Sequence, residues 1–140
     1  MSQENVEVVR RVLEITQEGV GDPAAAYDKC VREGLLAPNH EWIAGRAAGL
    51  EDVVGREGYL QFTRIWTEDF EDVAVEIEEI VDTDSDRVVA ITRFSGVGKG
   101  SRVPVEMRAG LVCTLDARRI ARVVPFSNPD HALRAVGLSE

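Results

Sequence analysis

The spacing of apolar residues changes once along this chain, from a helical period to a strand period, and this change limits the folds that the chain can adopt. Up to Trp66 the apolar positions recur three and four residues apart, which is the spacing of one helix face. From Glu71 onward apolar and polar residues alternate, as in strands with one buried face. Helices that precede strands, rather than alternating with them, predict an α+β fold.

Capping residues, glycines and polar turns divide the chain into short elements. The helical part contains helices that begin at Ser2 and at Asp22-Pro23, a short strand at His40–Ala44, a loop at Gly45–Gly55 and a helix at Arg56–Trp66. The strand part contains four long strands that begin near Glu71, Arg87, Arg102 and Ile120, followed by a short helix from Asn128-Pro129 to Val136. Because the turns between the long strands are short, the sheet is predicted to be mostly antiparallel. No linker or repeat interrupts residues 1–140, which are predicted to form a single domain.

Charge and composition exclude several classes of partner. The 16 Lys and Arg residues against 25 Asp and Glu residues give a net charge of −9, which repels nucleic acid and anionic membranes. Cys30 and Cys113 belong to no metal-ligand spacing and are predicted to be buried apolar residues, so neither a metal nor a cofactor is expected. No apolar run approaches the roughly 18 residues of a membrane helix, and Met1–Arg10 contains no signal-peptide core, which favours the cytoplasm.

Several phrases, in this order along the chain, resemble the SnoaL-like branch of the NTF2-like superfamily. They are Met1–Arg11, His40–Trp42, Gly55–Gly58, Asp86–Val89 and Ala132–Leu138. The resemblance implies a strongly curved, mostly antiparallel sheet wrapped around the N-terminal helices to form a cone with one open mouth, and a short C-terminal helix. It also implies a homodimer formed through the outer face of the sheet. The family includes polyketide cyclases, steroid isomerases, epoxide hydrolases, dehydratases and binding modules, so the resemblance implies a fold more than a function.

Strand alternation indicates which side chains would face the inside of such a cone. Met107 and Leu111 belong to the apolar face of their strand, with Ala109, Cys113 and Leu115. Similarity to the epoxide-hydrolase members adds further inward positions on three other strands: Val89, Ile91, Arg93, Ser95, Val123, His40, Trp42 and Ala44. The helical stripe of Tyr59, Phe62 and Trp66 would pack in the core and also line the pocket.

Arg93 and His40 are the candidate polar groups of this pocket. A buried guanidinium needs a carboxylate, water or an anionic ligand, so Arg93 either orients an anionic ligand or faces outward and pairs with a neighbour such as Glu106. His40 either acts as a base or hydrogen-bond donor near neutral pH or is a strand-edge histidine without a catalytic role. These two are the candidate catalytic residues.

The sequence departs from the family at the positions of the familiar catalytic groups. Ser95 and Pro125 stand where epoxide-hydrolase members carry aspartates, and Leu111 stands where many relatives carry a histidine. Without these groups the main hypothesis is a pocket protein that binds a small, largely apolar molecule with a polar or anionic group, and whether it is an enzyme stays open. One alternative is an isomerase, cyclase or dehydratase with His40 as base and Arg93 as oxyanion stabiliser. Another is a dimerisation module whose pocket is filled by its own side chains.

Overall fold

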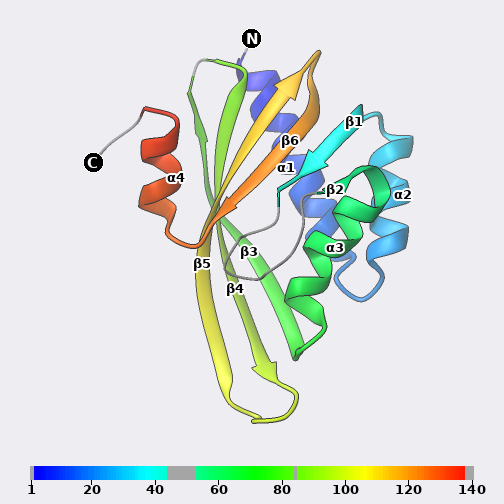
Figure 1. Cartoon of the computed structure of the whole chain (residues 1–140), viewed down its shortest axis with the longest axis vertical. Coiled ribbons are helices and arrows are strands. Elements are labelled where there is room, and N and C mark those ends of the chain that lie inside the picture. Colours follow the sequence, from blue (N-terminus) through cyan, green and yellow to red (C-terminus); the bar gives the residue numbers. More distant parts are fainter. Residues whose placement is uncertain (1, 44–52, 84, 138–140) are drawn as a thin grey trace.

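Among the residues that the structure describes, six strands form one sheet with helices on both of its faces (Figure 1). The structure is a computed structural model, and it describes residues 2–43, 53–83 and 85–137. The helices are α1 (Ser2–Glu18), α2 (Pro23–Arg32), α3 (Gly55–Thr67) and α4 (Pro129–Ala135). The strands are β1 (Leu36–Trp42), β2 (Val53–Val54), β3 (Phe70–Asp82), β4 (Arg87–Gly98), β5 (Pro104–Asp116) and β6 (Arg119–Phe126).

The strand order β2-β1-β6-β5-β4-β3 confirms the predicted α+β fold with a mostly antiparallel sheet. The pairing of β1 with β6 is parallel, and the other pairings are antiparallel. The first strand begins at Leu36, four residues before the predicted start at His40. Most of the predicted loop Gly45–Gly55, together with Ala44, lies outside the described residues; Val53–Val54 form β2 and Gly55 begins α3.

Two capping side chains start helices where the sequence predicts them. The Asp22 carboxylate accepts a hydrogen bond from the backbone N–H of Ala25 at 3.2 Å, and Pro23 occupies the first turn of α2. The Asn128 side chain accepts from the N–H of Asp130 at 2.9 Å and begins α4 in the same way. These local bonds set the short turns before α2 and α4, and thereby the direction in which both helices pack.

Each face of the sheet is covered by its own apolar cluster. Alternate residues of β4 and β5, including Val88, Leu111 and Cys113, pack with α1, α2 and α3 in the main core. The intervening residues Val89, Ile91 and Val112 pack with Ala132 of α4 in a smaller cluster on the opposite side. Figure 1 shows α4 on one side of the sheet and the β4–β5 hairpin extending beyond the helices. The middle of the sheet is therefore buried on both faces.

A glycine in β5 lets α4 approach the sheet. A Cβ added at Gly110 would lie 2.5 Å from the Ala132 Cβ and 3.1 Å from the Pro129 Cα, closer than side chains pack. We expect Gly110→Ala to lower the free energy of unfolding by about 1–3 kcal/mol because α4 must move outward. Urea unfolding measures the change. Gly100→Ala is the matched control, because an added Cβ there meets nothing within 4 Å and should leave stability nearly unchanged.

Candidate functional site

A small cavity lies between the main-core face of the sheet and helices α1 and α3. Its volume is about 20 Å³, little more than the roughly 10–15 Å³ that a cavity needs to hold one water. The lining residues come from α1 (Val9, Val12, Leu13, Thr16), β1 (Trp42), α3 (Tyr59, Phe62), β5 (Leu111, Cys113) and β6 (Ile120, Val123). Among the described residues that line it, none carries a carboxylate, amine, guanidinium or imidazole.

Three aromatic residues line this cavity, and the ring of Trp42 packs against the rings of the other two. The Trp42 ring centroid lies 5.2 Å from that of Tyr59, at an interplanar angle of 79°, and 5.2 Å from that of Phe62. All three residues are buried. Ring contacts of this geometry add stability beyond the burial of apolar area, so this side of the wall is expected to be rigid.

The polar atoms of the cavity wall are bonded within the protein. The Thr16 hydroxyl donates to the Val12 carbonyl oxygen at 2.8 Å, and the Thr16 and Tyr59 hydroxyl oxygens lie 2.7 Å apart. The Trp42 indole N–H donates to His40 Nδ1 at 2.7 Å. Burial raises the pKa of the free Cys113 thiol to about 12, and burial also raises the pKa of Tyr59. Both groups are therefore protonated and uncharged at neutral pH.

His40 lies behind Trp42, and its two bonds fix its proton. The indole N–H can only donate, so Nδ1 must carry a lone pair and the ring proton of neutral His40 must be on Nε2. That Nε2 lies 3.1 Å from the Tyr27 hydroxyl oxygen, which accepts the bond. Protonating Nδ1 would set two donors against each other. His40 is 3 % exposed, and this burial lowers its pKa below the ordinary histidine value.

The lowered pKa of His40 predicts a loss of stability in mild acid. Above about pH 6.5, the pKa of an unperturbed histidine, the group is neutral in both the folded and the unfolded chain. As the pH falls below that value, His40 binds a proton in the unfolded chain but stays neutral in the folded protein. The free energy of unfolding should therefore fall by up to about 1.4 kcal/mol per pH unit until the pKa of folded His40 is reached.

Denaturation curves between pH 7 and pH 5 measure this effect. His40→Gln cannot titrate but can still accept from Trp42 and donate to Tyr27, so its stability should depend less on pH than that of the wild type. His131→Gln, at an exposed position of α4, is the control and should keep the wild-type dependence. Parallel curves for the wild type and His40→Gln would contradict the assignment.

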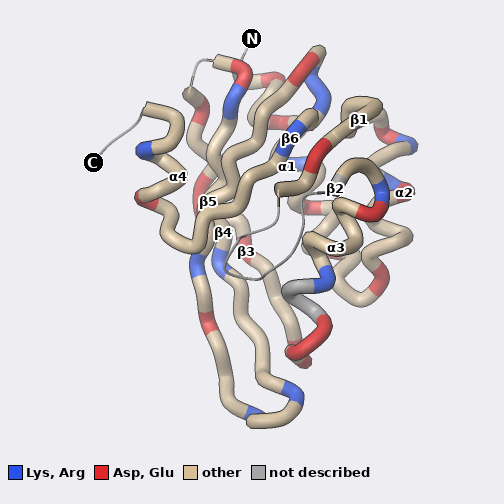
Figure 2. Tube along the Cα trace, viewed as in Figure 1, with Lys and Arg blue, Asp and Glu red and all other residues tan. Residues whose placement is uncertain are grey.

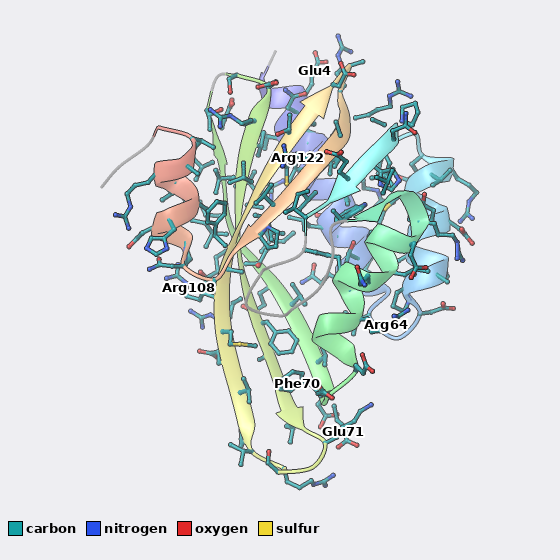
Figure 3. All side chains as sticks on the ribbon, viewed as in Figure 1. Glu4, Arg64, Phe70, Glu71, Arg108 and Arg122 are labelled. Carbon is teal, nitrogen blue, oxygen red and sulfur yellow. The ribbon has the colours of Figure 1, made fainter. Side chains whose placement is uncertain are left out.

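Arg93 faces away from the cavity, and its predicted inward position is wrong. In the register of the sheet it shares a face with Ile91, which packs under α4. Its Nη2 lies 2.8 Å from Glu78 Oε2 and its Nη1 lies 3.8 Å from Glu106 Oε1, with 40 % of the side chain exposed. Arg108 donates to Glu78 as well, on the α4 side of the sheet (Figure 3). Carboxylates on both neighbouring strands thus attract the guanidinium to the outer face.

The other predicted ligand-binding residues divide between the cavity and elsewhere. Trp42, Tyr59, Phe62, Leu111 and Val123 line the cavity. The side chains of β4 that were predicted to face inward lie on the outer face instead, so Ile91 and Ser95 share that face with Arg93. Met107 is on the inner face but 47 % exposed, since it belongs to the hairpin that extends past the helices. Trp66 belongs to α3, but its side chain lies outside the described part of the structure.

Sequence reasoning assigned no pocket role to the cavity residues of α1 or to Ile120. Val9, Val12, Leu13 and Thr16 carry a clear signal, the helical apolar stripe, but that stripe identifies core residues and cannot tell which of them border an empty space. Within the described ranges no group of three His, Cys, Asp or Glu residues could hold a metal, and no helix is long and apolar enough to cross a membrane. Figure 2 shows acidic residues gathered where α3 passes into β3.

Comparisons with known proteins identify the fold. The sequence matches no protein-family profile and no curated protein. A putative SnoaL-like polyketide cyclase from Jannaschia sp. CCS1 superposes with a TM-score of 0.69 at 20 % identity, over 99 % of this chain and 94 % of that one. An NTF2-like protein of unknown function from Burkholderia pseudomallei K96243 gives 0.69 at 14 % identity, over 96 % and 98 %.

A third similar structure carries a bound small molecule. It is a hypothetical protein with a ketosteroid isomerase-like fold from Catenulispora acidiphila, in complex with trimethylamine, with a TM-score of 0.64 at 17 % identity over 91 % of this chain and 92 % of that one. Sequence identities at this level establish a shared fold and no more. The chain therefore has the α+β cone fold of the SnoaL-like and NTF2-like proteins.

Proposed function

We propose that this protein binds a small, uncharged, largely apolar molecule in the cavity between α1, α3 and the sheet. The observation that carries the proposal is the composition of the described part of the wall, which is apolar and aromatic and contains no ionised group. A charged ligand would lose its hydration there without gaining an oppositely charged partner, which is strongly unfavourable. An apolar ligand would lose little and gain contacts with the three aromatic rings.

The structure supports an uncharged ligand rather than an anionic one. The sequence predicted that Arg93 would bind the anionic group of a ligand, but Arg93 pairs with Glu78 on the opposite face of the sheet. At about 20 Å³ the cavity accepts little more than one water-sized group as it stands, and it is far smaller than the roughly 150 Å³ of an engineered cavity that binds benzene. Binding of a larger molecule therefore requires side chains of the wall to move, which would cost part of the affinity.

The solved structures with this fold support a small-molecule role in a general way. One is described as a putative polyketide cyclase, and another holds trimethylamine. For a catalytic role in this chain, His40 would have to supply a lone pair as general base. The ring lone pair of neutral His40 lies on Nδ1 and accepts the Trp42 N–H. It is therefore not available to a substrate, which favours binding over acid–base catalysis.

Thermal unfolding with a neutral, an anionic and a cationic small probe tests the proposal. The probes are toluene, benzoate and trimethylammonium, the last because a protein of this fold holds the amine. We expect toluene alone to stabilise the wild type, approaching about 2.7 kcal/mol at 100 times its dissociation constant. Arg93→Ala should bind toluene unchanged, because the guanidinium lies on the other face.

Two adjacent valines of β6 provide a matched pair of variants. Val123 lines the cavity, whereas Val124 packs in the cluster under α4. Val123→Ile adds one methylene, which is enough to fill the space, and should abolish the toluene effect, while Val124→Ile should preserve it. No response to toluene would mean that the cavity is only a packing defect. A response to trimethylammonium alone would replace the neutral ligand by a cation held on the aromatic rings.

We also propose that two copies associate through the outer face of the sheet beside α4. Support comes from the charges there, since Arg93 and Arg108 lie among Glu78 and Glu106, and such a mixed surface can pair with itself about a two-fold axis. Sedimentation velocity should give a dimer for the wild type and a monomer for Glu106→Arg. A wild-type monomer would refute this proposal without affecting the cavity.

A further inference from the structure

Among the described residues that line the cavity, four have polar side-chain atoms, and each of them can donate one hydrogen bond. They are Thr16, Trp42, Tyr59 and Cys113. The Trp42 N–H is used by His40, and the Cys113 thiol is directed at the Leu111 carbonyl oxygen at 3.9 Å. The two hydroxyls remain. Where their protons lie decides which polar group of a ligand the wall can recognise.

The hydroxyl protons of Thr16 and Tyr59 follow from their partners. Thr16 has one proton, and it is directed at the Val12 carbonyl oxygen at 2.8 Å. The 2.7 Å contact between the two hydroxyls is then made by the Tyr59 proton, with Thr16 Oγ1 as acceptor. The opposite arrangement would leave the Tyr59 proton unpaired in an apolar wall, which is unfavourable. Every donor among the described side chains of the wall is therefore used within the protein, and only hydroxyl lone pairs are left.

We infer that the cavity selects a ligand whose polar group donates a hydrogen bond, such as an alcohol, over the corresponding carbonyl compound. The inference rests on the proposed function and narrows it. An alcohol can donate to a free lone pair of Tyr59 Oη or Thr16 Oγ1 without breaking a hydrogen bond of the wall. A ketone finds no free donor and must bind with its oxygen unpaired or break the Tyr59–Thr16 bond.

Cyclopentanol, cyclopentanone and methylcyclopentane test this selection, because they share ring size and number of heavy atoms. Dissociation constants come from titrations followed by NMR of the methyl groups of Val9, Leu111 and Val123, which line the cavity. For the wild type we expect cyclopentanol to bind about fivefold tighter than cyclopentanone.

Thr16→Val should reverse this order, since it removes the acceptor and frees the Tyr59 proton for a carbonyl oxygen. Thr16→Ser should keep the wild-type order, which separates the hydroxyl from the shape of the side chain. The double variant Thr16→Val with Tyr59→Phe should bind alcohol and ketone equally. Near-UV circular dichroism confirms that each variant is folded at the titration temperature.

The outcomes distinguish this inference from the proposed function. If methylcyclopentane binds the wild type but cyclopentanone binds as tightly as cyclopentanol, the selection for a donor is refuted and the apolar cavity stands. An unchanged order in Thr16→Val would refute it as well. If none of the three compounds binds, the proposed function fails, and the inference fails with it.

Discussion

Replacing Trp42 by alanine should lower the free energy of unfolding by about 3–5 kcal/mol, the usual cost of truncating a large buried aromatic side chain. Trp42 is 4 % exposed and contacts the rings of Tyr59 and Phe62. Its loss would leave an empty space beside the cavity and an unpaired Nδ1 on His40. Equilibrium unfolding in guanidinium chloride measures the change.

Trp42→Phe separates packing from hydrogen bonding. It keeps an aromatic ring but removes the N–H, so it should cost less than the alanine variant while still leaving His40 Nδ1 without its donor. That nitrogen can then accept a proton, so the pKa of His40 should rise relative to the wild type, as followed by NMR of the ring protons. A phenylalanine variant with an unchanged His40 pKa would contradict the assigned tautomer.

Leu111→Ala should cost about 2–5 kcal/mol and should also create a larger binding cavity. Leu111 is 1 % exposed and lines the existing space, so truncation joins its volume to the present cavity. We expect the variant to bind benzene more tightly than the wild type, because an apolar cavity of sufficient size stays dry and accepts such ligands. Thermal unfolding with and without benzene checks both parts.

Val112→Ala is the matched control for this variant. Val112 is the next residue of the same strand but faces α4 rather than the cavity. Its truncation should destabilise the protein without any gain in benzene binding. Equal benzene binding by both variants would mean that the effect reflects general loosening of the sheet, and would contradict the position assigned to the cavity.

The helical part of the chain and the face of β5 could be derived from the sequence because each depends on local chemistry. Asp22 and Asn128 cap their helices through bonds to the next few residues, which the chain order alone supplies. In β5 nearly all apolar residues occupy one set of alternate positions, so Leu111 and Cys113 could face only the core. The aromatic positions Tyr59 and Phe62 followed from helical spacing for the same reason.

The site itself depended on contacts between distant segments. Thr16 and Tyr59 meet across 43 residues of sequence, and His40 is neutral in a fixed tautomer only because Trp42 and Tyr27 approach it from two sides. Sequence spacing could suggest that His40 and Trp42 share a strand face. It could not show that the indole N–H would occupy the lone pair which a catalytic base needs.

The sequence by itself determined that helices precede a mostly antiparallel sheet, because the period of the apolar residues reports burial on one face of each element. Only the tertiary structure decided which side chains of β4 face the main core and which face α4. Its residues Val88–Ile91 are all buried, because helices cover both faces of the sheet. When both faces of a strand are apolar, the alternation of apolar and polar residues cannot show which face lies toward the main core. Glu78 and Glu106, on the neighbouring strands β3 and β5, hold the Arg93 guanidinium on the outer face, away from the cavity.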